Sequence, residues 1–179
     1  MEIISAMDQR IILSSEEAPG VELKSIGAED LENLRAWKNE HREFFFFKGI
    51  ISETDQLKWY EQYLRRPDDF MFVILVEHSP IGCIGFRYTE GKVDIYNVIL
   101  GAKEMGGRGL MSGALRIMCS YAAELYRGVQ GLKVLRHNPA VGWYKQNGFR
   151  EIAAFEEHLE LELDEERFKF CPVRVDQLM

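Results

Sequence analysis

The chain has 179 residues, 46% of them apolar, which is enough for one domain that buries about 70% of its unfolded surface. Its formal net charge of −7 argues against nucleic acid as a partner, because phosphate backbones require a basic face. Its longest apolar run, residues 70–76, is far shorter than the roughly 20 residues that cross a bilayer, so we expect no membrane partner.

The cysteines and the amino-terminal segment indicate the compartment. Cys83, Cys119 and Cys171 are scattered and lack CxxC spacing, so we expect buried thiols in a reducing environment, with no disulfide set and no metal site. Residues 1–20 carry several charges and lack the apolar core of a secretory signal. We therefore expect a cytoplasmic protein, with residues 1–20 as a loose extension ahead of a single domain over residues 21–179.

The first half of this domain reads as a strand, two helices and an antiparallel meander of three strands. Alternating apolar residues predict the strands, and apolar spacings of three and four predict the helices. Ser52 is a suitable N-cap for the second helix, because its hydroxyl can accept a bond from a first-turn N–H and acidic residues follow it. In chain order, these elements cover residues 21–26, 28–40, 52–64, 70–77, 80–88 and 92–100.

The second half begins with a glycine-rich turn and an amphipathic helix over residues 110–126, whose inward face is expected to extend from Met111 to Leu125. Alternation places Phe155 on the same strand face as Leu159, Leu161 and Leu163. The elements after the long helix cover residues 132–136, 139–147, 149–163 and 168–175. This order predicts an α+β fold with a mixed, mostly antiparallel central sheet and helices on both faces.

The glycine-rich turn, Gly106-Gly107-Arg108-Gly109, leads directly into the helix start Leu110-Met111-Ser112. Glycine lets a ligand approach the backbone, and first-turn N–H groups point outward without intrahelical partners, so the segment suits a phosphate or diphosphate. A plain tight turn with a helix start is the alternative interpretation. A Walker loop is excluded because Gly107 and Arg108 stand where Lys and Ser/Thr are required. A dinucleotide fingerprint also fits poorly, because no acidic residue ends a strand about 20 residues later.

Residues 137–149 read His-Asn-Pro-Ala-Val-Gly-Trp-Tyr-Lys-Gln-Asn-Gly-Phe. With the glycine loop, the long helix and the short strand before it, this segment resembles the GNAT superfamily of N-acetyltransferases. Trp37-Lys38-Asn39 and Leu57-Lys58-Trp59 resemble motifs of the ribosomal-protein-acetylating branch of that superfamily. The resemblance extends over roughly residues 21–170 and implies a GNAT-like fold. It also implies acetyl-CoA as the coenzyme and a primary amine as the acceptor.

The resemblance assigns the coenzyme to two segments. The loop and helix start would hold its diphosphate, and the strand Val98-Ile99-Leu100 would pair with its pantetheine arm if the neighbouring strand splays away. Asn138 either donates to the coenzyme or caps the helix that follows it. Two residues depart from the family pattern: Gly106 replaces the usual Arg or Gln, and Met111 replaces the usual small residue. The loop would then depend on Arg108 and on backbone amides.

The resemblance also implies catalytic residues. Tyr144 matches the family's tyrosine ahead of Gly-Phe and is the candidate general acid, because a phenol with a pKa of about 10 stays protonated at neutral pH. Asp94, on the strand leading to the loop, is the candidate base for an ammonium group, and His137 and Glu90 are the alternatives. Asn97, which strict alternation places on the opposite strand face, is positioned to hold a water for the acceptor.

The run of four aromatics, residues 44–47, lies where the family forms part of its acceptor pocket, so Phe45 and Phe46 are candidate acceptor contacts. A buried connection between helices is the alternative interpretation. The Trp37 and Trp59 motifs favour protein N-termini or nucleotide-linked amino sugars as acceptors, and other small amines stay open. We expect a monomer or homodimer. A non-catalytic acyl-CoA-binding module of the same fold is the alternative to the enzyme.

Overall fold

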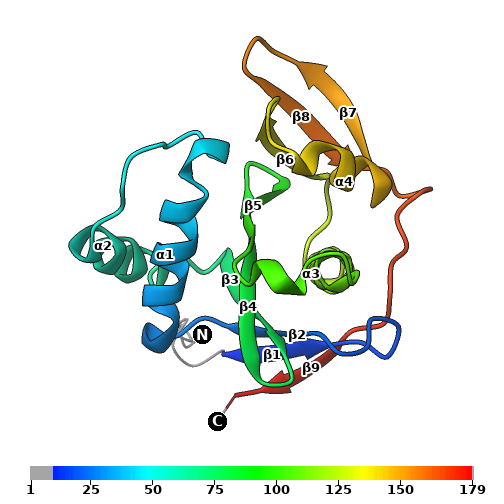
Figure 1. Ribbon diagram of the computed structural model, residues 1–179. Helices are drawn as coiled ribbons and strands as arrows, with labels where there is room; N and C mark the ends of the chain where they lie inside the picture. The colour runs from blue at the N-terminus through cyan, green and yellow to red at the C-terminus, as the bar shows by residue number, and fades with distance from the viewer. Residues whose placement is uncertain (1–9, 179) are drawn as a thin grey trace.

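The computed structural model describes residues 10–178 and contains one mixed sheet with helices on both sides (Figure 1). Its helices are α1 (Leu31–Glu40), α2 (Glu53–Tyr63), α3 (Leu110–Leu125) and α4 (Ala140–Gln146). Its strands are β1 (Ile11–Ser14), β2 (Glu22–Ser25), β3 (Asp69–Val76), β4 (Ser79–Thr89), β5 (Lys92–Leu100), β6 (Gln130–Leu135), β7 (Phe149–Ala154), β8 (His158–Leu163) and β9 (Arg174–Gln177). No helix in the described range is long and apolar enough to cross a bilayer.

The sheet runs in the order β7-β8-β6-β5-β4-β3-β2-β1-β9, and only the β5–β6 pair is parallel. The predicted meander is confirmed as β3, β4 and β5, and the turn between β4 and β5 places Glu90 and Gly91 at positive φ. Ser52 is the N-cap of α2, and its hydroxyl accepts a bond from the N–H of Asp55 at 3.1 Å. The predicted α+β class with a mostly antiparallel sheet is confirmed.

The centre of the sheet is buried on both faces, which explains the continuous apolar run of β3. Phe72 and Ile74 point into a core beneath α3, whereas Met71 and Val73 point into a second core beneath α1 and α2. Because successive strand residues face opposite sides, a strand covered by helices on both faces must be apolar at every position. Figure 1 shows α1 and α2 on one side of β3–β5 and α3 on the other.

The structure corrects the prediction for residues 1–20. Ile11–Ser14 forms β1, which pairs with β2 on one side and with β9 on the other, so this segment belongs to the sheet. Leu13 is fully buried there. Residues 1–9 lie outside the described residues. A four-residue strand carries too little periodicity to be seen without its partners, and β9 comes from the opposite end of the chain.

Three smaller predictions are also wrong. Phe155 does not share the buried face of the strand, because it lies in the turn between β7 and β8 and its ring stacks on His158. Leu125 is exposed because it is the last residue of α3. The last strand covers Arg174–Gln177 only, since it begins where the chain reaches β1.

Candidate active site

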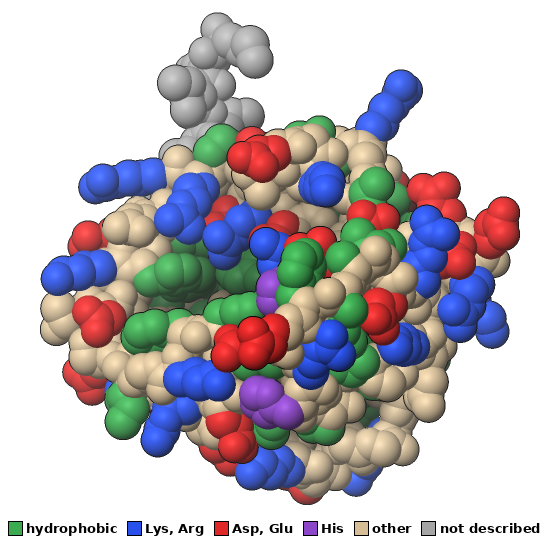
Figure 2. Space-filling model, turned by 90° about the horizontal axis from the view of Figure 1, so that it is seen from above, with side chains coloured by type: hydrophobic (Ala, Val, Ile, Leu, Met, Phe, Trp, Pro, Cys, Tyr) green, Lys and Arg blue, Asp and Glu red, His purple; other side chains and the backbone are tan. Residues whose placement is uncertain are grey.

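The candidate site begins where the two parallel strands separate. β5 and β6 pair only near their starts, through Val93 with Gln130 and Asp94 with Gly131. Farther along, β5 continues to pair with β4 and β6 with β8, so β5 and β6 diverge. A cavity of about 1010 Å³ lies at this divergence. Figure 2 shows the molecule from above, with a hollow that has hydrophobic side chains on its floor and charged side chains along its rim.

A β-bulge interrupts β5 at the divergence. Cys83 of β4 faces Ile99, but Gly85, two residues later, faces Tyr96, so β5 has one extra residue. Asn97 takes up this residue with a φ of +50°, a left-handed conformation in which asparagine is enriched among non-glycine residues. The bulge interrupts the hydrogen-bonding pattern between β4 and β5 beside the cavity. The alternation of side chains between the two faces of β5 therefore shifts by one residue there.

Resetting the alternation changes the environment of Asn97. Its side-chain oxygen accepts a hydrogen bond from Lys38 of α1, so Asn97 lies on the same face of the sheet as Asp94. Strict alternation had predicted the opposite face. The Lys38 ammonium also lies 3.6 Å from the centre of the Phe45 ring. Burial lowers the pKa of Lys38 to about 8, and the nearby charge of Arg87 acts in the same direction.

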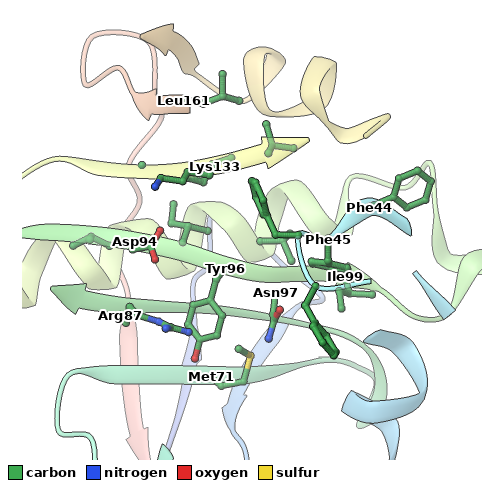
Figure 3. A pocket seen from close by; sticks show the side chains of 18 of the residues that line it. Phe44, Phe45, Met71, Arg87, Asp94, Tyr96, Asn97, Ile99, Lys133 and Leu161 are labelled. Atoms are coloured by element: carbon green, nitrogen blue, oxygen red, sulfur yellow. The ribbon is translucent and has the colours of Figure 1, made fainter. Parts of the chain in front are cut away.

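Asp94 lies in the same layer, in a row of charged residues across three strands. In register it faces Arg87 of β4, which in turn faces Asp69 of β3. Burial raises the pKa of the Asp94 carboxyl, and the positive charges of Arg87 and Lys133 oppose that rise. Figure 3 shows Asp94 between Lys133 on the β6 side and Arg87 on the β4 side, with the Arg87 side chain alongside Tyr96.

All four residues of the aromatic run, residues 44–47, line the cavity. The segment extends from the end of α1 across to the carboxy-terminal half of the chain. The backbone oxygen of Glu43 lies 2.8 Å from His137 Nε2, and the Phe46 ring packs edge-on against His158. Because Phe46 is more than half exposed, the run forms a wall of the cavity and not a buried connection.

Tyr144 and Asn138 reach the cavity from the α4 side. The Tyr144 ring is almost fully buried between Trp143 and Phe149, and burial raises the pKa of its phenol. The side-chain oxygen of Asn138 accepts a bond from the N–H of Ala140 at 2.9 Å. Asn138, the residue before the N-cap Pro139, therefore satisfies the first N–H group of α4, and it also borders the cavity.

The glycine loop presents open backbone ahead of α3. Gly107 and Gly109 have φ values of +75° and +74°, and a Cβ at either position would meet no atom within 4 Å. The first helical bond of α3 joins Gly113 N to Gly109 O, so the preceding N–H groups have no partner one turn earlier. Arg108 is exposed beside them. This arrangement fits a diphosphate, which requires close backbone approach, unpaired donors and a cation.

The helix start after the loop is held from the inside. Leu110 and Met111 pack against the core, so the bulky Met111 side chain turns away from the loop surface. The Ser112 hydroxyl accepts a bond from Trp143 Nε1 at 3.0 Å, which links α3 to α4. The replacement of a small residue by methionine therefore leaves the loop backbone open.

The structure gathers one group of the predicted residues around the cavity: Phe45, Phe46, Asp94, Asn97, Val98, Ile99, Asn138 and Tyr144. The other group, Leu100 and the segment from Gly106 to Ser112, does not line it. This second group follows directly in the chain, where β5 leads out of the sheet toward α3.

Residues 21–150, nearly three quarters of the chain, match the family described as acetyltransferase (GNAT) domain. The chain belongs to the GNAT acetyltransferase family. No curated protein matches this GNAT chain in a sequence comparison.

Solved GNAT structures share its fold. Spermidine N-acetyltransferase from Vibrio cholerae, solved with CoA and spermine, has a TM-score of 0.69 at 17% identity and covers 83% of this chain and 97% of its own. RimL, a ribosomal alpha-N-protein acetyltransferase solved with coenzyme A, has a TM-score of 0.66 at 13% identity, with 89% and 95% covered. FdhC, a nucleotide-linked sugar GNAT, has a TM-score of 0.70 at 15% identity, with 83% and 88% covered. At these identities the likeness shows the fold alone.

Lys38 and Arg87 are among the cavity residues of this GNAT domain that were not predicted from the sequence. Lys38 follows the buried Leu34 by one helical turn, so its position on the inner face of α1 was readable from helical spacing. Arg87 offered no such signal, because its place depends on the register between β4 and β5.

Proposed function

We propose that this GNAT domain moves an acetyl group directly from acetyl-CoA to a primary amine. The observation that carries the proposal is the divergence of β5 from β6, with a bulge and a cavity at the point of separation. Acetyl-CoA supplies the acetyl group as an activated thioester when bound. The acceptor is a protein N-terminus, an amino sugar or another small amine.

Backbone groups would hold the coenzyme. The N–H groups of residues 110–112 and the guanidinium of Arg108 would donate to its diphosphate, and Gly107 and Gly109 would allow the close approach. The segment from Val98 to Leu100 borders the gap beside β6, so its backbone would pair with the amides of the pantetheine arm.

Side chains around the cavity would move the protons. An alkyl ammonium must lose a proton before its nitrogen can attack, and the Asp94 carboxylate would accept it directly or through water. Burial raises the Asp94 pKa above its usual value, which makes its carboxylate a stronger base. The Tyr144 Oη would donate a proton to the departing sulfur, and its raised pKa keeps it protonated until then.

Cys83 also lines the cavity, which raises the alternative of a covalent thioester intermediate. Burial raises the pKa of this thiol to about 12, so it stays protonated at neutral pH. Since the thiolate is the nucleophilic form of cysteine, direct transfer to the amine is the better-supported route.

Replacing Tyr144 with Phe tests the proposal. We expect kcat for acetyl transfer to fall about 100-fold, the usual contribution of a general acid, while the Kd for CoA measured by calorimetry stays unchanged. Tyr121→Phe, which removes the half-buried hydroxyl of an α3 tyrosine that does not line the cavity, should leave both quantities unchanged.

Two other results would redirect the interpretation. CoA binding without acetyl transfer to any amine in a broad panel would favour the non-catalytic acyl-CoA-binding module. Failure of the folded protein to bind CoA at all would overturn the proposal.

A further inference from the structure

Arg87 extends into the cavity from β4 without an acidic partner. Its guanidinium lies 3.9 Å from the centre of the Tyr96 ring, and its Nε is buried without a hydrogen-bond partner. Within residues 10–178, no carboxylate oxygen lies within 4.0 Å of an Arg87 nitrogen. The buried Nε–H is left unpaired, which is unfavourable, and the two Nη groups carry four further donors, so this side chain is suited to a further acceptor.

The carboxylates on the neighbouring strands do not satisfy it. Asp69 is bonded to the Tyr96 hydroxyl and to Arg66, whose Nη1 lies 3.3 Å from its oxygen. Asp94 faces Arg87 in register, yet its oxygens lie beyond ion-pair distance. The Arg87 guanidinium is therefore held in place by its contact with the Tyr96 ring, and its N–H donors remain available to bind a ligand.

A second cation faces the same cavity. Lys38 of α1 donates to Asn97 and, like Arg87, has no carboxylate within 4.0 Å among the described residues. Arg87 and Lys38 line the same cavity, and the charge of Arg87 acts with burial to lower the pKa of Lys38. Partly buried like charges are costly to hold side by side, and an anion bound there would relieve the repulsion.

We propose that the amine acceptor carries an anionic group, a carboxylate or a phosphate, and that Arg87 binds this group. The inference rests on the acetyltransferase function proposed above. The register supports it, because Asp94 and Arg87 are direct cross-strand neighbours, whose Cβ atoms lie about 5 Å apart in a typical sheet. An acceptor whose amine and anion are separated by a short spacer can reach both. A polyamine offers the Arg87 guanidinium no anionic acceptor.

Two matched pairs of amines test the inference: β-alanine against propylamine, and phosphoethanolamine against ethanolamine. We expect kcat/KM to be at least about tenfold higher for the amine that carries an anionic group than for its partner without one, the effect of one charge-assisted hydrogen-bonded pair. Whichever pair shows the larger ratio identifies carboxylate or phosphate as the preferred anion. Equal values within both pairs would overturn the inference.

Substitutions then assign the preference to Arg87. In Arg87→Gln the ratio should fall to within about twofold through a higher KM for the anionic amine, because the charged donor is gone. Arg87→Lys should keep part of the phosphate preference, since an ammonium binds phosphate as a point charge but lacks the planar fork. Arg65→Gln removes an exposed arginine after α2 and should leave the ratio unchanged. An unchanged ratio in a folded Arg87→Gln protein would contradict the assignment.

Direct binding separates this inference from the proposed function. Propionate and inorganic phosphate are titrated by calorimetry into wild-type protein in the presence of saturating CoA, and into Arg87→Gln. If no amine is acetylated, Arg87-dependent binding of either anion would support the anion site while the enzymatic proposal fails. An active acetyltransferase that binds neither anion, or binds both equally after Arg87→Gln, would overturn the anion site alone.

Discussion

The two proposed sites of this protein are made of different groups. The proposed coenzyme site consists of backbone: glycines at positive φ, first-turn N–H groups and the edge of β5. The proposed acceptor site consists of side chains from several elements around the cavity, among them Lys38, Arg87 and Asp94. A site made of backbone groups depends on the conformation of the chain and tolerates many side chains. The binding properties of a site made of side chains change with each substitution. This difference suits a protein with one fixed donor and an acceptor particular to itself.

Asp94→Asn tests the proposed acceptor site and should have the largest effect on acetyl transfer. We expect kcat/KM for acetyl transfer to fall by about 100- to 1,000-fold, the range of a general base. The wild-type rate should fall as the pH drops through the Asp94 pKa, which burial raises above its usual value, because the protonated carboxyl cannot accept a proton. The variant should lack this acidic limb.

Initial-rate assays of acetyl transfer across the pH range would check both expectations. Glu61→Gln, which removes an exposed carboxylate of α2, is the control. An acidic limb that persists unchanged in Asp94→Asn would show that another group is the base.

Gly109→Val tests the proposed coenzyme site. A β-branched residue cannot easily adopt the φ of +74° at the start of α3, so the loop should rearrange. We expect the Kd for CoA to rise about 100-fold, the loss of roughly two charge-assisted hydrogen bonds. Calorimetry would measure the change.

Gly91→Val provides the matched control for this prediction. Gly91 has a φ of +75° and open space beside it, like Gly109, but it lies in the turn between β4 and β5. Both variants should lose about 1–2 kcal/mol of stability through backbone strain, and only Gly109→Val should lose coenzyme affinity. Equal loss of affinity in both would mean that strain alone weakens binding.

Lys38→Met should have the smallest effect of these substitutions, and we expect this effect on the free energy of unfolding. The pKa of Lys38 is lowered from its usual 10.5 to about 8 by burial, so between these pH values the unfolded chain holds this proton and the folded protein does not. Stability from this group therefore rises as the pH increases from about 8 to about 10.5, and below about pH 8 the full cost of burying the charge is present.

We accordingly expect Lys38→Met to be about 2 kcal/mol more stable than the wild type at pH 7, and this advantage should shrink above pH 8. Urea unfolding at several pH values would measure it. Lys58→Met, an exposed lysine of α2, should show no such trend. A constant difference between pH 7 and pH 10 would mean that Lys38 is not a buried charge.

Local signals were sufficient for most of the fold. The alternation in β3–β5, the Ser52 cap and the turn at Gly91 involve residues a few positions apart, so their chemistry is complete in a short window of sequence. Strand β1 was missed because its partners β2 and β9 lie outside such a window. Leu125 and Phe155 followed the right period but stood at the end of a helix and in a turn, where the neighbouring elements no longer cover them.

The sequence by itself determined the order of the elements, the glycine-rich helix start and the residue types available for proton transfer. Only the tertiary structure decided that β5 and β6 diverge, that a bulge turns Asn97 toward Lys38, and that Arg87 faces Asp94 without pairing with it. The physical reason is that register, divergence and unmet charge are relations between segments that approach each other only after folding. A site made of backbone can therefore be recognised from a local motif, whereas a site made of converging side chains becomes visible in three dimensions.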